Sequence, residues 1–389
     1  MKFSSKLATP SNDALSHSQK LLDKIREAIL QNDGSISFRD YMEMALYEKG
    51  LGYYVAGARK IGDTGDFTTA PEISPLFSQC LASKCLSILS KIKGDILELG
   101  AGSGIMAVDI MLELERESSL PEHYYILDLS PELKQRQRQT IEKLAPHLLH
   151  HFTWLDTLPE SFRGVILGNE VLDAMPIELF TLQGGSIYQH QVIWENEQLL
   201  EQLNPAPNQL ENAVSTLDID NQNKPYTSEV NLNLDGWFQA LSDCLTQGVI
   251  ILIDYGYTAS EYYHPDRNKG TLICHYQHQV NESPLLYSGL QDITANVDFT
   301  AVAESADKAG LQILSYSPQA AFLASNNLEK FFIRTLDAFP EKQYKLAQQV
   351  RTLSLPSEMG ERFKVITLAK DYLYELGEAS SQVDQRYRL

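Results

Sequence analysis

The sequence predicts an α/β fold with a Rossmann-like, mostly parallel and doubly wound sheet. From residue 94 onward, strand-like segments alternate with helical ones. The segments at 164–170 and 248–256 contain continuous apolar runs, as do strands that are buried on both faces. A glycine-rich turn at 100–104 joins the first strand to its helix. This alternation favours a parallel sheet with helices on both sides.

The individual elements follow from periodicity and from helix-start signals. A helix is predicted over 20–31. Apolar residues recur at helical spacing over 75–92, where Ser74 and Pro75 suit an N-cap and the first helical position. In the same way Ser130 opens a helix in front of a proline. The predicted core elements are strands at 95–99, 124–129, 164–170, 248–256 and 363–369, and helices at 105–116 and 131–144.

Two regions interrupt the alternation. Residues 183–235 are polar, rich in Asn and Gln and broken by prolines, which is typical of an inserted hairpin and loop. Residues 256–298 hold Gly, Pro, His and Tyr without a clear period, and long irregular insertions at the carboxyl edge of a sheet usually carry function. The predicted organisation is an N-terminal helical and loop extension at 1–90 that contributes to the cofactor site, a core at 91–370 with these two insertions, and a tail at 371–389.

Composition narrows the class of protein. The chain has 389 residues and a formal net charge of −19. A field of that sign disfavours a nucleic-acid substrate and attracts basic protein segments. The N-terminus has no apolar secretory segment, and the densest apolar stretch, 249–253, is far too short to span a membrane. We therefore expect a cytoplasmic protein with no membrane partner.

The cysteines do not indicate a metal or disulfide site. Cys80, Cys85, Cys244 and Cys274 form no CxxC pair, so we expect buried, reduced thiols. His275 beside Cys274 lacks a full set of metal ligands nearby, and no metal is expected.

The glycine-rich turn is the strongest local signal for a ligand. Gly100, Gly102 and Gly104 allow a tight turn and a close approach of the backbone to a ligand at a helix N-terminus, with Ala101 inside the turn. Dinucleotide enzymes prefer G-x-G-x-x-G, whereas this spacing is G-x-G-x-G with Glu98 two residues before it. An acid there suits the ammonium of S-adenosyl-L-methionine, while the turn amides face its carboxylate. A purely structural turn is the alternative.

Further polar residues stand where a nucleoside ligand would need them. Asp128 ends the next strand, in the place of an acid that grips ribose hydroxyls, with Leu129 beside it, and a solvated strand end is the alternative. The loop GDFTTAPEIS at 65–74 precedes a helix, and its polar side chains either contact a ligand or serve only to cap and shape the loop.

An acidic motif follows the strand at 164–170. Glu170 and Asp173 are three residues apart, so on a helical turn they share one face. Two carboxylates there would hold a cationic guanidinium or amine, and the alternative is an acid cluster favoured by a helix dipole. Asp254 ends the next apolar strand in a similar position, as a substrate contact or a plain strand end.

Taken together, these segments resemble the MidA family along nearly the whole chain. The pairing of GDFTTAPEIS with NEVLDAMP is specific. The matching blocks are GYYVAGARKIGDTGDFTTAPEIS, DILELGAGSG, YYILDLSPELKQRQ, GVILGNEVLDAMP, VIILIDYG, GTLICHYQHQ, QDITANVDFTAV and MGERFKVITLAK.

The resemblance implies a class I methyltransferase core with S-adenosyl-L-methionine as cofactor. In the mitochondrial branch of the family it implies symmetric dimethylation of an arginine on a complex I subunit. It assigns cofactor contacts to Gly65, Thr69, the turn at 100–104, Asp128 and Asn169, with Glu170 beside them. Asp128 stands where family members commonly have Glu, and either acid can grip a ribose.

The resulting hypothesis is in-line methyl transfer to a protein substrate with a basic segment, with arginine as the candidate acceptor and Glu170 and Asp173 as catalytic carboxylates. A carboxylate pair would localise the guanidinium charge on one nitrogen and expose another. Two alternatives are a non-catalytic assembly factor that binds the same cofactor and a nicotinamide-dependent oxidoreductase. The sequence specifies neither the acceptor, nor the number of methyl groups, nor the oligomeric state.

Overall fold

The chain forms two compact units, each built from several segments. The computed structural model describes residues 7–56, 69–220, 224–377 and 382–389. The first unit contains residues 1–67, 172–234 and 257–298, and the second contains residues 68–171, 235–256 and 299–389. Residues 68–90, which the sequence assigns to the extension, thus lie in the second unit.

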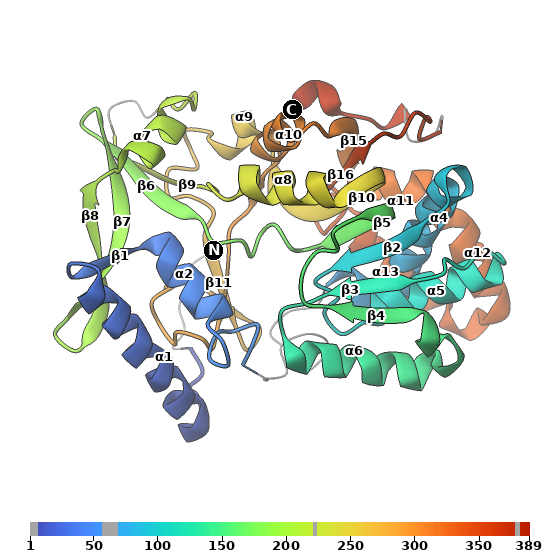
Figure 1. Cartoon of the computed structure of the whole chain (residues 1–389), viewed down its shortest axis with the longest axis horizontal. Coiled ribbons are helices and arrows are strands. Elements are labelled where there is room, and N and C mark those ends of the chain that lie inside the picture. The colour runs from blue at the N-terminus through green and yellow to red at the C-terminus, as the bar shows by residue number, and fades with distance from the viewer. Residues whose placement is uncertain (1–6, 57–68, 221–223, 378–381) are drawn as a thin grey trace. The chain divides into compact units, whose positions relative to one another are not determined.

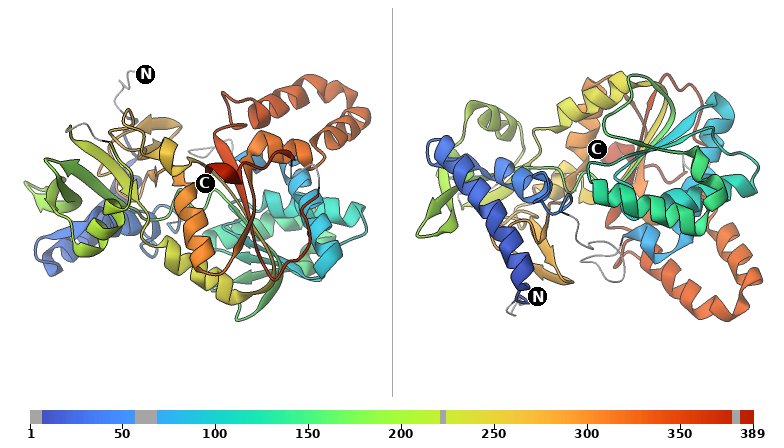
Figure 2. Two further views of the ribbon diagram at one scale, coloured as in Figure 1. Left: turned by 90° about the horizontal axis from the view of Figure 1, so that it is seen from above. Right: turned by 60° about the horizontal axis from the view of Figure 1, so that its bottom comes forward.

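The second unit is built on a mostly parallel sheet with helices on both of its faces (Figures 1 and 2). Its strands run in the order β15-β16-β10-β5-β2-β3-β4. The pairs from β10 to β4 are parallel, whereas β16 is antiparallel to both of its neighbours. The strands are β2 (Asp95–Leu99), β3 (Tyr124–Leu127), β4 (Phe152–Leu155), β5 (Phe162–Asn169), β10 (Leu245–Tyr257), β15 (Gln312–Pro318) and β16 (Phe363–Lys370).

The helices of this unit begin where their capping residues allow. Ser74 and Ser130 accept hydrogen bonds from the first turns of α4 and α6, as the sequence predicts. The helices are α3 (Ala70–Ile73), α4 (Pro75–Ile92), α5 (Ile105–Arg116), α6 (Pro131–Leu144), α8 (Leu234–Cys244), α10 (Phe299–Lys308), α11 (Gln319–Ser325), α12 (Leu328–Ala338) and α13 (Gln343–Ser354), with 3-10 turns η1 (Pro146–His151), η2 (Pro340–Lys342) and η3 (Arg386–Arg388).

Both faces of the central strands are buried, which is why their sequences are continuously apolar. In β10, Val249 and Ile251 pack into a core shared with α4, α5 and α11 to α13, while Ile250 and Leu252 point to the opposite face and are equally buried. This arrangement confirms the predicted doubly wound, Rossmann-like α/β fold. The β15 strand and α10 to α13 were not among the predicted elements.

The first unit carries a separate antiparallel sheet covered by helices. Its path is β1-β7-β6-β9, with β8 paired to β7, and a small sheet has the order β12-β11-β13. The strands are β1 (Ser35–Ser37), β6 (Glu178–Gln183), β7 (Ser186–Glu195), β8 (Gln198–Pro205), β9 (Tyr226–Val230), β11 (Ile273–Tyr276), β12 (Gln279–Asn281) and β13 (Asp292–Thr294). The two-residue strand β14 (Val297–Asp298) is part of neither of these sheets. The helices are α1 (Asn12–Gln31), α2 (Phe38–Tyr47), α7 (Asn208–Ser215) and α9 (Ala259–Tyr262).

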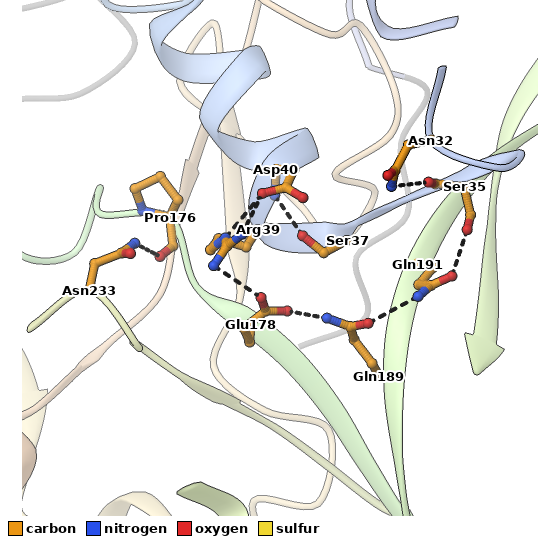
Figure 3. A network of polar contacts seen from close by, with 10 residues as sticks. All are labelled: Asn32, Ser35, Ser37, Arg39, Asp40, Pro176, Glu178, Gln189, Gln191 and Asn233. Carbon is orange, nitrogen blue, oxygen red and sulfur yellow. Dashed lines mark hydrogen bonds and ion pairs between the residues drawn. The ribbon is translucent and has the colours of Figure 1, made fainter. Parts of the chain in front are cut away.

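A buried polar network ties α2 to this sheet (Figure 3). The Arg39 guanidinium lies 3.6 Å from Oε1 of Glu178, and the side-chain amide of Gln189 donates to the other oxygen of Glu178 at 2.8 Å. Gln191 then donates to Gln189 at 3.0 Å and accepts from Ser35 at 2.7 Å. Because these side chains bond to one another in series, the network fixes the start of β6 against α2 and β1.

Two further observations bear on the predicted class. Among the described residues, no helix combines the length and apolarity needed to cross a membrane. All four cysteines are buried and have free thiols, as predicted.

Candidate functional site

Residues from four neighbouring strands meet at the carboxyl edge of the parallel sheet. In the strand register, Leu99 lies opposite both Leu127 and Gly168, and Asn169 lies opposite Ile253. The polar or turn residues at these aligned strand ends are Gly100, Asp128, Asn169 and Asp254. The strand order also reverses between β2 and β5, which is where ligands bind in open α/β sheets.

The glycine turn after β2 has a backbone that requires glycine. Gly100, Gly102 and Gly104 have φ values of 64°, 53° and 84°. A Cβ atom on Gly104 would lie only 3.0 Å from Cα of Gln137. Gly104 is also the N-cap of α5, so the turn leads directly to the free N–H groups of a helix N-terminus. Ala101, within the turn, is buried. These features make the turn suited to an anionic ligand group.

Glu98 is buried in β2, two residues before the turn. Its Oε2 accepts a hydrogen bond from the Tyr124 hydroxyl at 2.7 Å. Burial raises the pKa of the Glu98 carboxyl to about 7, partly opposed by the bond from Tyr124 and reinforced by the charge of Asp128. The group therefore titrates near neutral pH, and a cation placed beside it would favour its ionised form.

Asp128 is held by two hydrogen bonds at the end of β3. The main-chain N–H of Ser130 donates to Oδ1 at 2.9 Å, and the side-chain amide of Gln137 donates to Oδ2 at 2.7 Å. Burial raises the pKa of Asp128, while these two bonds lower it. Next to the acid, Leu129 is 66% exposed and offers an apolar surface.

The loop that precedes α4 touches the glycine turn. Thr69 is the N-cap residue of α3, although its side chain makes no capping bond, and Gly65 lies outside the described residues. Glu72 on α3 accepts a short hydrogen bond from the Ser103 hydroxyl in the turn. Burial, together with the charge of Glu72, raises the pKa of Asp109 on α5 to about 7. This end of the loop is therefore linked to the turn through side chains.

Asn169 and Glu170 follow β5 at the same edge. The Asn169 amide donates to Oε1 of Glu170 at 3.1 Å, and the main-chain N–H of Glu170 donates to the carbonyl of Ile253 at 2.8 Å. Glu170 has a φ of 53°, an uncommon conformation for a residue with a side chain. The buried Oδ1 of Asn169 accepts no hydrogen bond from any described residue, which leaves an acceptor for a ligand.

The segment from Glu170 to Pro176 is not helical, so the shared helical face of Glu170 and Asp173 was a wrong expectation. A single turn occupies this segment, with the N–H of Met175 donating to the carbonyl of Leu172 at 3.2 Å. The left-handed conformation of Glu170 prevents a helix from starting there, and Pro176 lacks the N–H that a continuing helix needs. The two carboxylates remain close in the chain but not by helical periodicity.

Asp173 lies in the first unit, in a turn that is hydrogen-bonded to a tyrosine hydroxyl. Its carbonyl accepts from the N–H of Ala295 at 3.1 Å, and the carbonyl of Ala174 accepts from the Tyr47 hydroxyl at 2.9 Å. The Tyr47 and Tyr54 rings stack with centroids 5.6 Å apart. Asp173 is only 6% exposed, so its main chain and side chain are both closely surrounded.

A second carboxylate stands beside the same tyrosine pair. The Tyr54 hydroxyl donates to Oδ1 of Asp292 at 2.9 Å. Burial raises the pKa of Tyr54, and the charges of Asp292 and Asp173 raise it further, in that order. Both aspartates are therefore near Tyr54.

Comparison with known sequences identifies the family. Residues 80–317, more than half of the chain, match the family Methyltransf_28, described as "Putative S-adenosyl-L-methionine-dependent methyltransferase". The chain belongs to the MidA family. Membership confirms the resemblance noted in the sequence. It also favours S-adenosyl-L-methionine, the cofactor of the family, over the nicotinamide alternative.

The similarity to individual MidA-type proteins covers nearly the whole chain. A COG1565 superfamily member from Burkholderia thailandensis, crystallised with S-adenosyl-homocysteine, is 36% identical with a TM-score of 0.94, and the match covers 99% of this chain and 100% of that one. The mitochondrial protein arginine methyltransferase NDUFAF7 of Danio rerio is 27% identical over 86% of this chain and 83% of its own length. Its Drosophila melanogaster homologue is 26% identical over 92% and 86%.

Three residues of this MidA protein, at the carboxyl edge of the sheet and near the turn that holds Asp173, could not be predicted from the sequence. Gln137, Tyr47 and Asp292 lack a local motif, since each gains its contacts from a segment distant in the chain. Gln137 offered one weak signal, because it shares a helical face with Leu133 and Ile141, which are buried.

Proposed function

We propose that this MidA protein transfers a methyl group from S-adenosyl-L-methionine to an arginine nitrogen of a protein partner. The observation that carries the proposal is the chain-long similarity to a structure bound to S-adenosyl-homocysteine and to proteins named protein arginine methyltransferases. The net charge of −19 is consistent with a basic acceptor segment.

The residues at the carboxyl edge of the sheet fit the cofactor. The turn at 100–104 and the N-terminus of α5 offer N–H groups to the methionine carboxylate. Asp128 offers two carboxylate oxygens to the ribose hydroxyls. The acceptor oxygens of Glu98 and Asn169 suit the ammonium group, and Leu129 adds an apolar surface. Gly65 and Thr69 belong to the loop proposed to complete this site.

The proposed acceptor residues are Glu170 and Asp173. When bound, the cofactor supplies an activated methyl group on a sulfonium, so the protein has to orient a nucleophile in line with it and exclude water. Ionised Glu170 and Asp173 would hold one edge of a guanidinium and concentrate its charge there. A bond then forms between the methyl carbon and the free nitrogen, the carbon–sulfur bond breaks, and a carboxylate or water takes the proton lost from nitrogen.

Labelling of acceptors tests this proposal. The full-length protein is incubated with methyl-labelled S-adenosyl-L-methionine and a cell lysate, and the labelled proteins are hydrolysed to amino acids. We expect the label in methylated arginine. Label only in lysine, in nucleic acid or in small molecules would overturn the arginine assignment. Tight binding of S-adenosyl-homocysteine with no transfer to any fraction would instead favour a non-catalytic assembly factor.

A further inference from the structure

Gln137 is a fully buried amide on a helix whose two other glutamines are exposed. Helix α6 contains three glutamines at alternate positions, and Gln135 and Gln139 are exposed while Gln137 has no accessible surface. Burying an amide is costly unless every donor and acceptor is used. The burial therefore indicates a specific set of contacts rather than a solvated helix surface.

Every polar group of this amide has a partner. Its nitrogen donates to Oδ2 of Asp128 at 2.7 Å and to the carbonyl of Gly102 at 3.2 Å. Its oxygen accepts from the indole N–H of Trp154 at 3.0 Å. An indole N–H can only donate and a carboxylate can only accept, so the chemistry of the partners allows a single orientation of the amide. The contact is thus directional, and it joins β3, the glycine turn and β4.

The same contacts determine how Asp128 faces a ligand. Ser130 and Gln137 each use one hydrogen-bonding position on a different carboxylate oxygen. Each oxygen can accept a second bond, so one position on each remains for two adjacent hydroxyls. Both bonds also favour the charged form of this buried acid and lower its pKa.

The close packing of Gln137 extends to the turn itself. Its Cα is the atom nearest to the site of a Cβ on Gly104, at 3.0 Å. The main chain of α6 and the turn are therefore in direct contact, and the amide bonds Gly102 in the same turn.

We infer that Gln137 is a positioning residue that fixes Asp128 and the glycine turn relative to each other, and so determines recognition of the cofactor's ribose. This inference rests on the proposed function, because it assumes that Asp128 contacts the ribose hydroxyls. This role differs from ordinary core packing, because Gln137 acts through the orientation and ionisation of Asp128.

The test compares three ligands on the intact protein. Calorimetry measures the Kd of S-adenosyl-L-homocysteine and of its 2′-deoxy and 3′-deoxy analogues, and thermal unfolding checks the fold of each variant. Wild type should lose about tenfold or more in affinity with each deoxy analogue, the scale of a charge-assisted hydrogen bond. Gln137→Leu should weaken binding of the parent ligand by about tenfold and reduce the discrimination to about threefold or less.

Matched variants separate positioning from stability. Gln139→Leu makes the same chemical change at an exposed site on the same helix and should keep wild-type discrimination. Gln137→Glu keeps the side-chain shape and the bond from Trp154 but places an acid against Asp128. Its affinity should fall at pH 8 and recover toward pH 6, where the two acids can share a proton. This second variant also tests the inference if Gln137→Leu fails to fold.

The outcomes distinguish a failure of the inference about Gln137 from a failure of the proposed cofactor role of Asp128. If Gln137→Leu binds all ligands more weakly but keeps the wild-type discrimination, Gln137 only supports packing and the inference is overturned. If wild type fails to bind S-adenosyl-L-homocysteine, or if Asp128→Asn keeps full discrimination, the proposed cofactor role of Asp128 fails instead. Loss of discrimination in both Asp128→Asn and Gln137→Leu, with Gln139→Leu unaffected, supports the inference.

Discussion

The hydroxyl of Tyr124 donates a 2.7 Å hydrogen bond to Glu98, and both side chains are buried in the core of the parallel sheet. Burial raises the pKa of Glu98 from 4.5 to about 7. Between these two values the folded protein binds a proton that the unfolded chain does not. The stabilising effect of this difference is complete below the unfolded pKa and is lost as pH rises through the folded pKa.

Stability of the ligand-free protein should therefore decrease as the pH rises from about 5 to about 7.5. Asp109, whose pKa burial also raises to about 7, contributes with the same sign. Glu98→Gln removes one titrating group and keeps an acceptor for Tyr124, so its melting temperature should vary less over this range. The measurement is thermal unfolding at a series of pH values. Glu160→Gln, at an exposed position, is the control, and a Glu98→Gln profile as steep as wild type would contradict the assignment.

S-adenosyl-L-homocysteine should raise the melting temperature, whereas NAD should not. A ligand at about 100 times its Kd stabilises the folded state by about 2.7 kcal/mol. Gly102→Val should remove this shift, because a branched side chain at a φ of 53° distorts the turn and blocks approach of the ligand. Scanning calorimetry with each ligand makes the comparison. Stabilisation by NAD alone would overturn the cofactor assignment.

Glu170→Gln and Asp173→Asn should each reduce methyl transfer by about tenfold or more. Each substitution keeps the size of the side chain and removes the charge that would hold a cationic acceptor. The affinity for S-adenosyl-L-homocysteine should change much less, since the proposed cofactor contacts lie elsewhere. Transfer rates with the labelled acceptor, or automethylation, provide the readout. Wild-type turnover in both folded variants would leave the carboxylates with a structural role only.

Tyr47→Phe should slow methyl transfer several-fold while leaving cofactor affinity unchanged. The substitution removes the hydroxyl that bonds the carbonyl of Ala174, next to Asp173, at a cost of about 1 kcal/mol in stability. Tyr41→Phe is a control on the same helix, where the hydroxyl bonds the carbonyl of Pro284 and the hydroxyl of Ser288 instead. Kinetics and unfolding of both variants should give similar losses of stability but a rate effect for Tyr47 alone. Equal rates of methyl transfer in the two variants would contradict a positioning role for Tyr47.

The parts of the fold that the sequence predicted are those with local signals. Helices α5 and α6 begin and end within a residue of the predicted bounds, because a glycine turn and a serine cap define their starts. The first helix was predicted from 20, yet α1 begins at Asn12, since Ser11 caps a polar first half that carries little apolar periodicity. Strand β15 mixes polar and apolar residues and gains its place by pairing with β16.

The candidate site likewise contains residues that local signals predict and residues that only the tertiary structure reveals. The positions of Gly100, Asp128 and Asn169 follow from the rule that ligands gather at strand ends, and the register places them side by side. Gln137 lies between polar residues, as do the exposed Gln135 and Gln139, so only tertiary burial distinguishes it. The turn at Leu172 could not be predicted, because it depends on the positive φ of Glu170, and no residue type in this segment indicates a positive φ.

The pairing of β1 with β7 has a consequence for synthesis on the ribosome. Ser35 pairs with Ile193, so about 160 residues must be translated before the first strand of the chain can meet its partner, which takes on the order of 10 s. During that interval the apolar faces of α1 and α2, including Leu21, Ile25 and Phe38, have no sheet to cover them. The nascent segment that holds α1 and α2 therefore exposes apolar side chains, and a chaperone that binds such segments should be required most at this stage of translation.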